Sequence, residues 1–216
     1  MMTGISTLKP LLLILALLST ASQTSEKPTA SRLLQTDEVI NLLLNPDADD
    51  YMRHWQAWGD PAIEKSDDGN RYFVVRNKGH FFQDVLLPED AAGKYVVLTG
   101  RASSERVNPD GTITGLPYLY GYMLDDLSSR GGRILAYLQG QKMLCSCEEE
   151  DRAAGLWGVF QVPEGARKLR FFLNQAERRG LPQSGSAARF DDLGLYLFET
   201  KQEAESFVKK YIQDDQ

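Results

Sequence analysis

Large apolar residues occupy every second position near the end of the chain. Leu193, Leu195 and Leu197 follow this pattern within residues 188–199, and they alternate with a glycine, a tyrosine and a phenylalanine at the next positions. Successive side chains of a β-strand point to opposite faces, so a period of two predicts a strand. Because both faces are largely apolar, we expect this strand to be covered on each side.

Similar short runs recur along the chain, separated by turns rich in Gly, Asn, Asp and Pro. Two such turns are predicted at residues 67–70 and 77–79. Many short strands joined by polar turns are typical of an all-β sandwich. The other predicted strands are residues 62–65, 71–75, 80–87, 94–103, 118–124, 132–138, 156–162 and 168–174.

The period changes after residue 199. Thr200 is followed three positions later by Glu203, which is the pattern of a helix capping box. Apolar residues then recur at helical spacing, which predicts an amphipathic helix over residues 201–213 that covers an edge or end of the sandwich. These apolar residues are Ala204, Phe207, Val208, Tyr211 and Ile212.

The first residues have the pattern of an export signal. Lys9 precedes an apolar run at residues 11–18, and small residues follow up to Ala21. This order predicts a secretory signal peptide over residues 1–21 and a secreted or periplasmic protein. The run is about half the ~20 residues of a membrane-spanning helix. A retained anchor is the alternative, and no membrane insertion is expected after cleavage.

The expected organisation follows from these patterns. Residues 22–34 form a polar, flexible leader, residues 35–199 the β-sandwich, and residues 200–216 the C-terminal helix and tail. The start of the sandwich is ambiguous, since residues 33–44 fit either a short helix or a first strand. Asn45 and Pro46 end either element, because a residue before proline disfavours helix.

Charge and cysteine content narrow the function classes. The net charge of -6 and the pI of about 5.0 argue against nucleic acid as a partner, because binding phosphates requires a basic surface. Cys145 and Cys147 are too few for a disulfide framework or a four-thiolate zinc site. They are candidates for a local disulfide, with a bond to another chain or two reduced thiols as alternatives.

Three motifs occur in a recognisable order. Residues 41–47 read Asn-Leu-Leu-Leu-Asn-Pro-Asp, Trp157 precedes a Val-Pro-Glu-Gly turn, and residues 190–193 read Phe-Asp-Asp-Leu. Over about residues 41–199 the chain resembles the carbohydrate-binding modules with a galactose-binding-like jelly roll that accompany xylanases and glucanases. It is also similar to the sugar-binding domain of certain F-box proteins.

The resemblance implies both a fold and a function. The expected fold is an all-β jelly-roll sandwich with a C-terminal helix, and the expected function is non-catalytic binding of a carbohydrate or cell-envelope glycan. In the resembling family an acidic residue of the closing segment often helps to hold a structural calcium. That implies Asp192, together with Asp47, as calcium ligands.

The candidate sugar-binding residues are mainly aromatic. Tyr118, Tyr120 and Tyr122 alternate along one strand, which places their rings on one face about 7 Å apart. Aromatic rings stack on the C–H faces of sugars, and the phenol also forms hydrogen bonds. The other candidates are Trp58, Asn174 and Gln175.

Alternatives remain open for these residues. One of Trp55 and Trp58 is a candidate for lining a ligand cleft, and burial under the N-terminal segment is the favoured alternative. If the tyrosines pack in the core instead, the protein is a structural or protein-interaction sandwich with a protein partner.

Catalytic patterns are missing from the sequence. His54 and His80 are the only histidines, and none of the common hydrolase or nucleotide-binding motifs occurs. Asp191 and Asp192 are adjacent in a predicted strand, so we expect their carboxylates to point to opposite faces. Two such groups could not flank one glycosidic bond. We therefore expect no enzyme activity and no catalytic residues.

Overall fold

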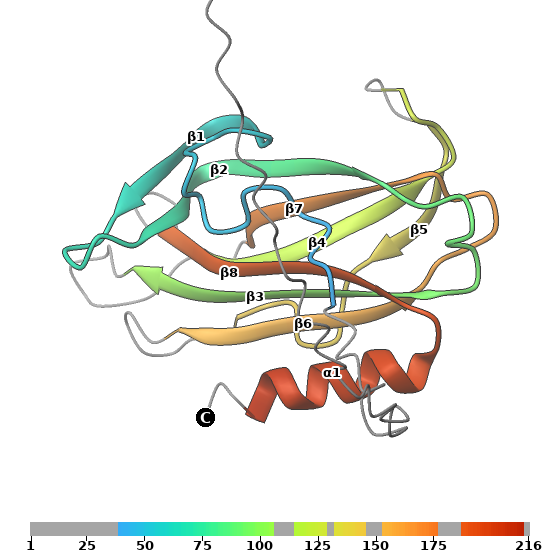
Figure 1. The fold of residues 1–216 in the computed structure, drawn as a ribbon. Helices are drawn as coiled ribbons and strands as arrows, with labels where there is room; N and C mark the ends of the chain where they lie inside the picture. Colours follow the sequence, from blue (N-terminus) through green and yellow to red (C-terminus); the bar gives the residue numbers. More distant parts are fainter. Residues whose placement is uncertain (1–38, 106–114, 129–131, 146–152, 177–186, 214–216) are drawn as a thin grey trace, which may run out of the picture. The chain divides into compact units, whose positions relative to one another are not determined.

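A computed structural model describes residues 39–105, 115–128, 132–145, 153–176 and 187–213, all within one compact unit, Val39–Gln216 (Figure 1). The described residues of this unit form eight antiparallel strands and one helix. The strands are β1 (Gln56–Lys65), β2 (Arg71–Leu86), β3 (Tyr95–Glu105), β4 (Leu116–Leu124), β5 (Ile134–Leu138), β6 (Ala154–Gln161), β7 (Lys168–Ala176) and β8 (Ala187–Phe198), and the helix is α1 (Lys201–Gln213).

The strands pair in the order β5-β4-β7-β2-β8-β3-β6, and β1 also pairs with β2. The long strand β2 belongs to two layers. Phe73 to Arg76 pair with β8, whereas His80 to Leu86 pair with β7. The first layer is thus β1, the second half of β2, β7, β4 and β5, and the second layer is β8, β3 and β6. The predicted jelly-roll β-sandwich is confirmed.

A bulge in β2 allows this change of partner. The sequence predicts a turn at residues 77–79, and this prediction is wrong. Asn77 has a φ of 49°, and the register of β1 with β2 shifts between Trp58 and Asp60. A Cβ on Gly79 would lie 3.0 Å from the carbonyl oxygen of Trp58. A positive φ and a close backbone approach, together with the register shift, define a bulge that bends a continuous strand.

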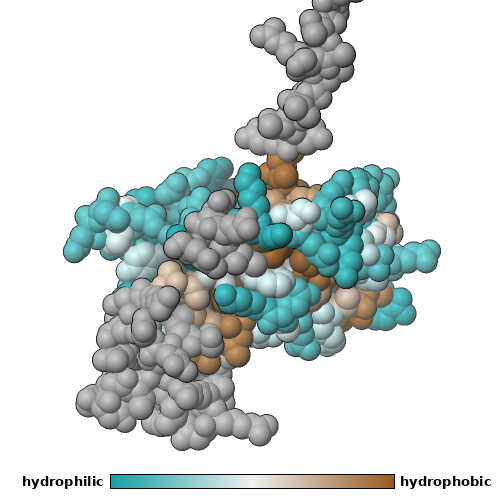
Figure 2. All heavy atoms as spheres, turned by 90° about the horizontal axis from the view of Figure 1, so that it is seen from below, coloured by the Kyte–Doolittle hydropathy of each residue, from teal (hydrophilic) through white to brown (hydrophobic). Residues whose placement is uncertain are grey.

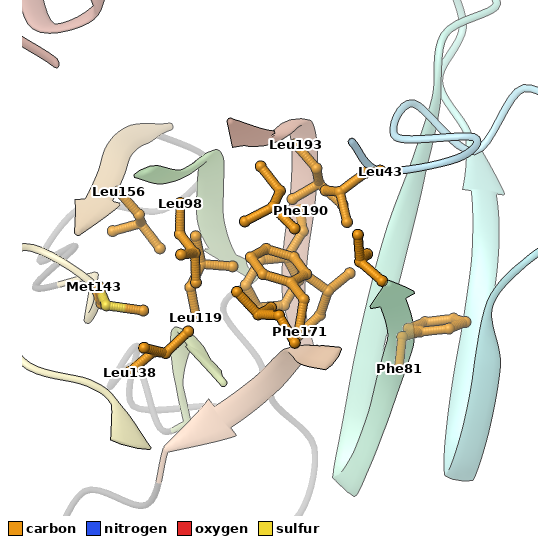
Figure 3. Packing of buried hydrophobic residues seen from close by; sticks show 14 of the residues in the cluster. Leu43, Phe81, Leu98, Leu119, Leu138, Met143, Leu156, Phe171, Phe190 and Leu193 are labelled. Carbon is orange, nitrogen blue, oxygen red and sulfur yellow. The ribbon is translucent and has the colours of Figure 1, made fainter. Parts of the chain in front are cut away.

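The core fills the space between the two layers. Phe171 from β7 and Leu119 from β4 meet Leu98 from β3, Leu156 from β6 and Phe190 from β8 (Figure 3). All five side chains are fully buried. Trp55 joins this core and lies against Phe73, with ring centroids 4.8 Å apart.

The segment before β1 links both layers without forming a helix or a strand. The Asn41 amide donates to the Leu193 carbonyl at 2.8 Å and accepts from the Leu195 N–H at 3.0 Å. On the other layer, the Gln83 side chain accepts from the Leu44 N–H and donates to the Leu44 carbonyl, both at 2.8 Å. Side-chain amides thus provide the hydrogen bonds that a strand would otherwise supply.

Helix α1 covers the outer face of the second layer, as its apolar pattern predicts (Figure 1). The capping box is confirmed: the Thr200 N–H donates to the Glu203 carboxylate at 3.0 Å, and the Glu203 N–H donates to the Thr200 hydroxyl at 3.2 Å. Ala204 and Val208 are buried against Val97. Seen from the α1 side, the described surface is mostly hydrophilic (Figure 2).

Among the described residues, no helix has the length and apolar character needed to cross a membrane.

Candidate functional site

The outward side of the first layer is lined with aromatic rings. On β4, Leu119 and Met123 are fully buried, whereas Tyr118, Tyr120 and Tyr122, at the alternate positions, are only partly buried. The neighbouring strands add further rings at the same level. We call this surface the aromatic face; it consists of Trp58, His80, Phe82, Tyr118, Tyr120, Tyr122, Tyr137 and Phe172.

The strand register arranges these residues in rows across the sheet. One row runs from Trp58 on β1 through His80 and Asn174 to Tyr118 on β4. The next row contains Gln56, Phe82, Phe172 and Tyr120. The last row contains Asp84, Arg170, Tyr122 and Tyr137. The strands themselves therefore set the spacing of the rings, so the surface is held by a rigid backbone.

The rings in the middle of the aromatic face stack on one another. Tyr120 is parallel to both Tyr118 and Phe172, with interplanar angles of 8° and centroid distances of 5.5 and 4.5 Å. Stacking covers much of the ring surface of Tyr120, so this residue presents mainly its edge and hydroxyl. Trp58 and Tyr137 lie on the same face at opposite edges of the layer, on β1 and β5, and are 63% and 62% exposed.

The indole ring of Trp58 packs on the imidazole ring of His80. Their rings stack with centroids 5.5 Å apart and an interplanar angle of 23°. Burial lowers the pKa of His80 below its ordinary value of 6.5, so the imidazole is neutral at pH 7. His80 also contacts Phe172, with ring centroids 5.5 Å apart. An exposed indole on a fixed aromatic support is a ready stacking platform.

An ion-pair network limits charge on this face. Arg170 binds Asp84 through two hydrogen bonds and lies over the Phe82 ring, 4.7 Å from its centroid. The fully buried Lys168 places its Nζ 3.0 Å from the same carboxylate. Burial raises the pKa of Asp84, but hydrogen bonds from Arg170 and Lys168 outweigh burial and hold this pKa below 3.8. Asp84 thus offsets one of the two positive charges, and its hydrogen bonds keep the Arg170 guanidinium in place.

Asn174 lies on the same side of the sheet as the aromatic face, and Gln175 does not. Asn174 pairs with Tyr118 across β7 and β4 and lies near the Tyr120 hydroxyl. Burial and the nearby Tyr122 raise the pKa of Tyr120 to about 12, so its hydroxyl keeps its proton at neutral pH. Gln175 is 8% exposed and directs its amide toward the Gly115 carbonyl, because consecutive residues of a strand face opposite sides. Of the candidate sugar-binding residues, Gln175 alone is separated from the others.

Sequence reasoning missed the cross-strand members of this face. His80, Phe82 and Asp84 alternate along β2, and Arg170 and Phe172 alternate along β7. This alternation is visible in the sequence. Whether these residues lie on the same face as the tyrosines depends on the pairing of strands that are distant in the chain. A single sequence does not provide that register.

Three carboxylates meet at a bulge in β8, contrary to the expectation for adjacent aspartates. The register of β3 with β8 shifts between Thr99 and Arg101, and Asp192 has a φ of 48°. This bulge turns Asp192 toward the side of Asp191. One oxygen from each of Asp47, Asp191 and Asp192 lies within 4.8 Å of the others. The prediction of opposite faces is wrong, because it assumed a regular strand.

The electrostatics of this acidic cluster suit a cation. Burial raises the pKa of Asp47, and repulsion from Asp191 and Asp192 adds to the effect. Burial also raises the pKa of Asp191, although a hydrogen bond of 2.6 Å from the Asn70 amide opposes it. Carboxylate oxygens are preferred ligands of hard cations such as calcium. The donor set thus fits a divalent cation, and Asp191 joins the two ligands expected from the resemblance.

Cys145 is disulfide-bonded and almost fully buried. Its expected partner, Cys147, lies outside the described residues, so the pairing stays a prediction.

Comparisons with known proteins identify the fold. No family model matches the sequence, and no curated protein matches it. A xylan-binding domain of the CBM 22 type aligns with a TM-score of 0.51 at 12% identity, over 74% of this chain and 97% of that domain. The enzymatically active domain of tailspike protein 4 from bacteriophage CBA120 aligns with a TM-score of 0.52 at 15% identity, over 74% of this chain.

The present chain spans only 22% of the tailspike protein's chain, but it spans nearly all of the xylan-binding domain. Identities this low establish the fold alone. The fold implied by the sequence motifs is confirmed: the chain has a jelly-roll β-sandwich like that of the xylan-binding domain.

Proposed function

We propose that this protein is an exported, non-catalytic module that binds a carbohydrate chain or cell-envelope glycan on the aromatic face. The observation that carries the proposal is the exposed Trp58, which stacks on His80 at one edge of the aromatic face. The exposed Tyr137 lies at the opposite edge of the same face. The fold is shared with a xylan-binding domain, which supports sugar as the class of ligand.

The chemistry of the face suits an uncharged sugar chain. Trp58 and Tyr137 offer free ring surface to the C–H faces of two sugars. Between them, Tyr120, Asn174 and Arg170 offer hydrogen-bonding groups to hydroxyls. Adjacent strands are about 4.8 Å apart, so the four intervals from β1 to β5 span roughly 19 Å across the strands, and the two exposed rings are also two rows apart along the strands. That span suits several linked sugars lying across the strands.

An alternative is a structural or protein-interaction sandwich without a sugar ligand. Exposed tryptophan and tyrosine are also enriched in protein interfaces, and Trp58 and Tyr137 would serve such a partner equally well. The experiment below separates the two functions.

The test is binding of the purified protein to an array of plant, microbial and animal glycans. Trp58→Ala should weaken binding at least tenfold, about 1.4 kcal/mol, because it removes the most exposed ring of the face. Tyr120→Ala should weaken binding too, with a further loss of stability, since Tyr120 packs on Phe172. Tyr51→Ala is the matched control, because Tyr51 is 61% exposed but lies outside the aromatic face.

Binding to no glycan, together with a stable protein partner that Trp58→Ala releases, would establish the alternative. Equal glycan binding by Trp58→Ala and the unaltered protein would place the sugar elsewhere.

Export rests on residues 1–21, which have the features of a signal peptide. The disulfide at Cys145 supports an oxidising compartment, since disulfides persist mainly outside the cytosol.

We further propose that Asp47, Asp191 and Asp192 hold a structural calcium ion. Calcium takes 6–8 oxygen ligands, and carboxylates and backbone carbonyls are both suitable. When bound, the ion would neutralise three converging negative charges. It would also tie the segment that contains Asp47 to the bulge of β8, so its contribution is to stability rather than to chemistry.

A further inference from the structure

A hollow lies on the outer side of the second layer, which is formed by β8, β3 and β6. Its volume is about 380 Å³, within the range of small-molecule sites. Ala102 and Phe190, whose side chains belong to the core, form part of its floor. The residues that give it chemistry are Asn70, Tyr72, Arg101, Ser103, Arg189 and Asp191. The hollow and the aromatic face therefore open on opposite sides of the sandwich.

Three strands and one turn hold these side chains. Arg101 and Ser103 alternate on β3, and their cross-strand partners Asp191 and Arg189 alternate on β8. The Arg189 guanidinium lies over the Tyr72 ring, 5.4 Å from its centroid. The turn before β2 is fastened to this arrangement by the 2.6 Å hydrogen bond from Asn70 to Asp191. The polar groups thus come from paired strands, and their positions are fixed by the sheet.

The types of side chain point to a sugar. Guanidinium and carboxylate groups each form paired hydrogen bonds, and pairs of neighbouring hydroxyls on a sugar ring match them. The amide of Asn70 and the hydroxyl of Ser103 add further polar groups, and the Tyr72 ring supplies an apolar wall. In the absence of the proposed calcium ion, Arg101 and Arg189 balance Asp191 and Asp192, so the described lining has no net charge.

We propose that this hollow is a second carbohydrate-binding site, which takes a single sugar residue or the end of a chain. Its small volume and polar lining differ from the aromatic face, which suits the middle of a chain. The choice of a sugar as ligand rests on the proposed function, whereas the location and the lining are independent of the aromatic face. A protein with both sites would hold two glycans, or two parts of one glycan, on opposite sides.

The test uses methyl glycosides of the common hexoses and pentoses, measured by calorimetry and by NMR of the purified protein. Arg101→Ala should weaken binding in the hollow at least tenfold, because it removes a planar donor without adding bulk. Ser103→Leu should block the hollow by filling it. Arg133→Ala is the matched control: Arg133 is an exposed arginine 3.4 Å from Asp125, as Arg101 is 3.8 Å from Asp192.

The decisive comparison is made in the Trp58→Ala background. The proposal expects that Trp58→Ala retains glycoside binding, with NMR shifts at residues 100–103, and that adding Arg101→Ala abolishes it. Loss of all binding in Trp58→Ala alone would overturn the second site and leave the aromatic face as the only site. A glycan chain of the array that binds Trp58→Ala as well as the unaltered protein, but no longer binds Arg101→Ala, would instead overturn the aromatic face and keep the hollow. No binding of any glycoside by the unaltered protein would overturn the hollow.

Discussion

Asp192 shows how one backbone angle changes the meaning of a sequence motif. In a regular strand Asp191 and Asp192 would face apart, as the sequence predicts. The positive φ of Asp192 marks a bulge, and the bulge brings both carboxylates to Asp47, which lies far from them in the chain. Neither the bulge nor the distant partner has a local signal, so the sequence alone provided two of the three acidic residues through a family resemblance.

The proposed calcium site has a pH-dependent consequence. At neutral pH, calcium at about 100 times its Kd should raise the free energy of unfolding by ~2.7 kcal/mol, measured as a higher Tm. The pKa values of Asp47 and Asp191 are raised above 3.8 in the folded protein, so these carboxyls take up protons as the pH falls toward 3.8. The calcium effect should therefore disappear at acidic pH, because protonated carboxyls no longer bind the ion.

Without calcium, the stability of the protein changes with pH in the opposite direction. Between pH 3.8 and the raised pKa values, the folded protein binds more protons than the unfolded chain, so cation-free stability falls as the pH rises. Asp47→Asn should raise this cation-free stability and abolish the calcium effect, whereas Glu164→Gln, in an exposed turn, should do neither. If calcium leaves the Tm unchanged at neutral pH, the proposed calcium site is wrong.

Strand β2 shows what local patterns reveal about the fold and what they hide. The two apolar runs at residues 71–75 and 80–87 are correctly predicted as β-structure, but they belong to one strand. An Asn-Lys-Gly sequence favours a turn and a bulge for the same reason, since Asn and Gly tolerate a positive φ. Only the pairing of β2 with β8 and β7 distinguishes the two outcomes.

Other elements follow the same logic. The helix α1 was predictable because its capping box and apolar spacing are local. β1 was predicted only in part, because this strand pairs with β2 alone, contains Pro61 and is largely exposed, so it lacks a clear alternation. Trp58 lies in that missed part, and its position on the aromatic face was not evident from the sequence.

The bulge in β2 can be tested at Asn77. Asn77→Val should lower the free energy of unfolding by ~1–2 kcal/mol, because a β-branched residue is strained at a φ of 49°. Asn77→Gly should be close to neutral, since glycine adopts this angle without strain. Urea unfolding measures both. If valine were tolerated as well as glycine, the positive φ would not be what allows β2 to change partners.

The two layers of the sandwich have different outer surfaces. The first layer exposes aromatic rings, whereas α1 covers part of the second layer and leaves the polar hollow beside it. Among the described residues, α1 packs against β3, β6 and β8, none of which contributes to the aromatic face. Damage to the α1 interface should therefore lower stability without altering the residues that we propose bind a glycan chain.

Val208 tests this separation. Its side chain is 4% exposed against Val97, so Val208→Asp buries an unpaired charge and should cost several kcal/mol. Ser206→Asp, on the exposed side of the same helix, should change stability by no more than about 0.5 kcal/mol.

Thermal unfolding measures both variants, and glycan affinity is measured well below the Tm, where Val208→Asp remains folded. Equal affinity for glycans with a lower Tm is expected, because β1, β2, β4, β5 and β7 keep their pairing without α1. A parallel loss of affinity would mean that the two layers are coupled through the core, and that the aromatic face depends on the helix after all.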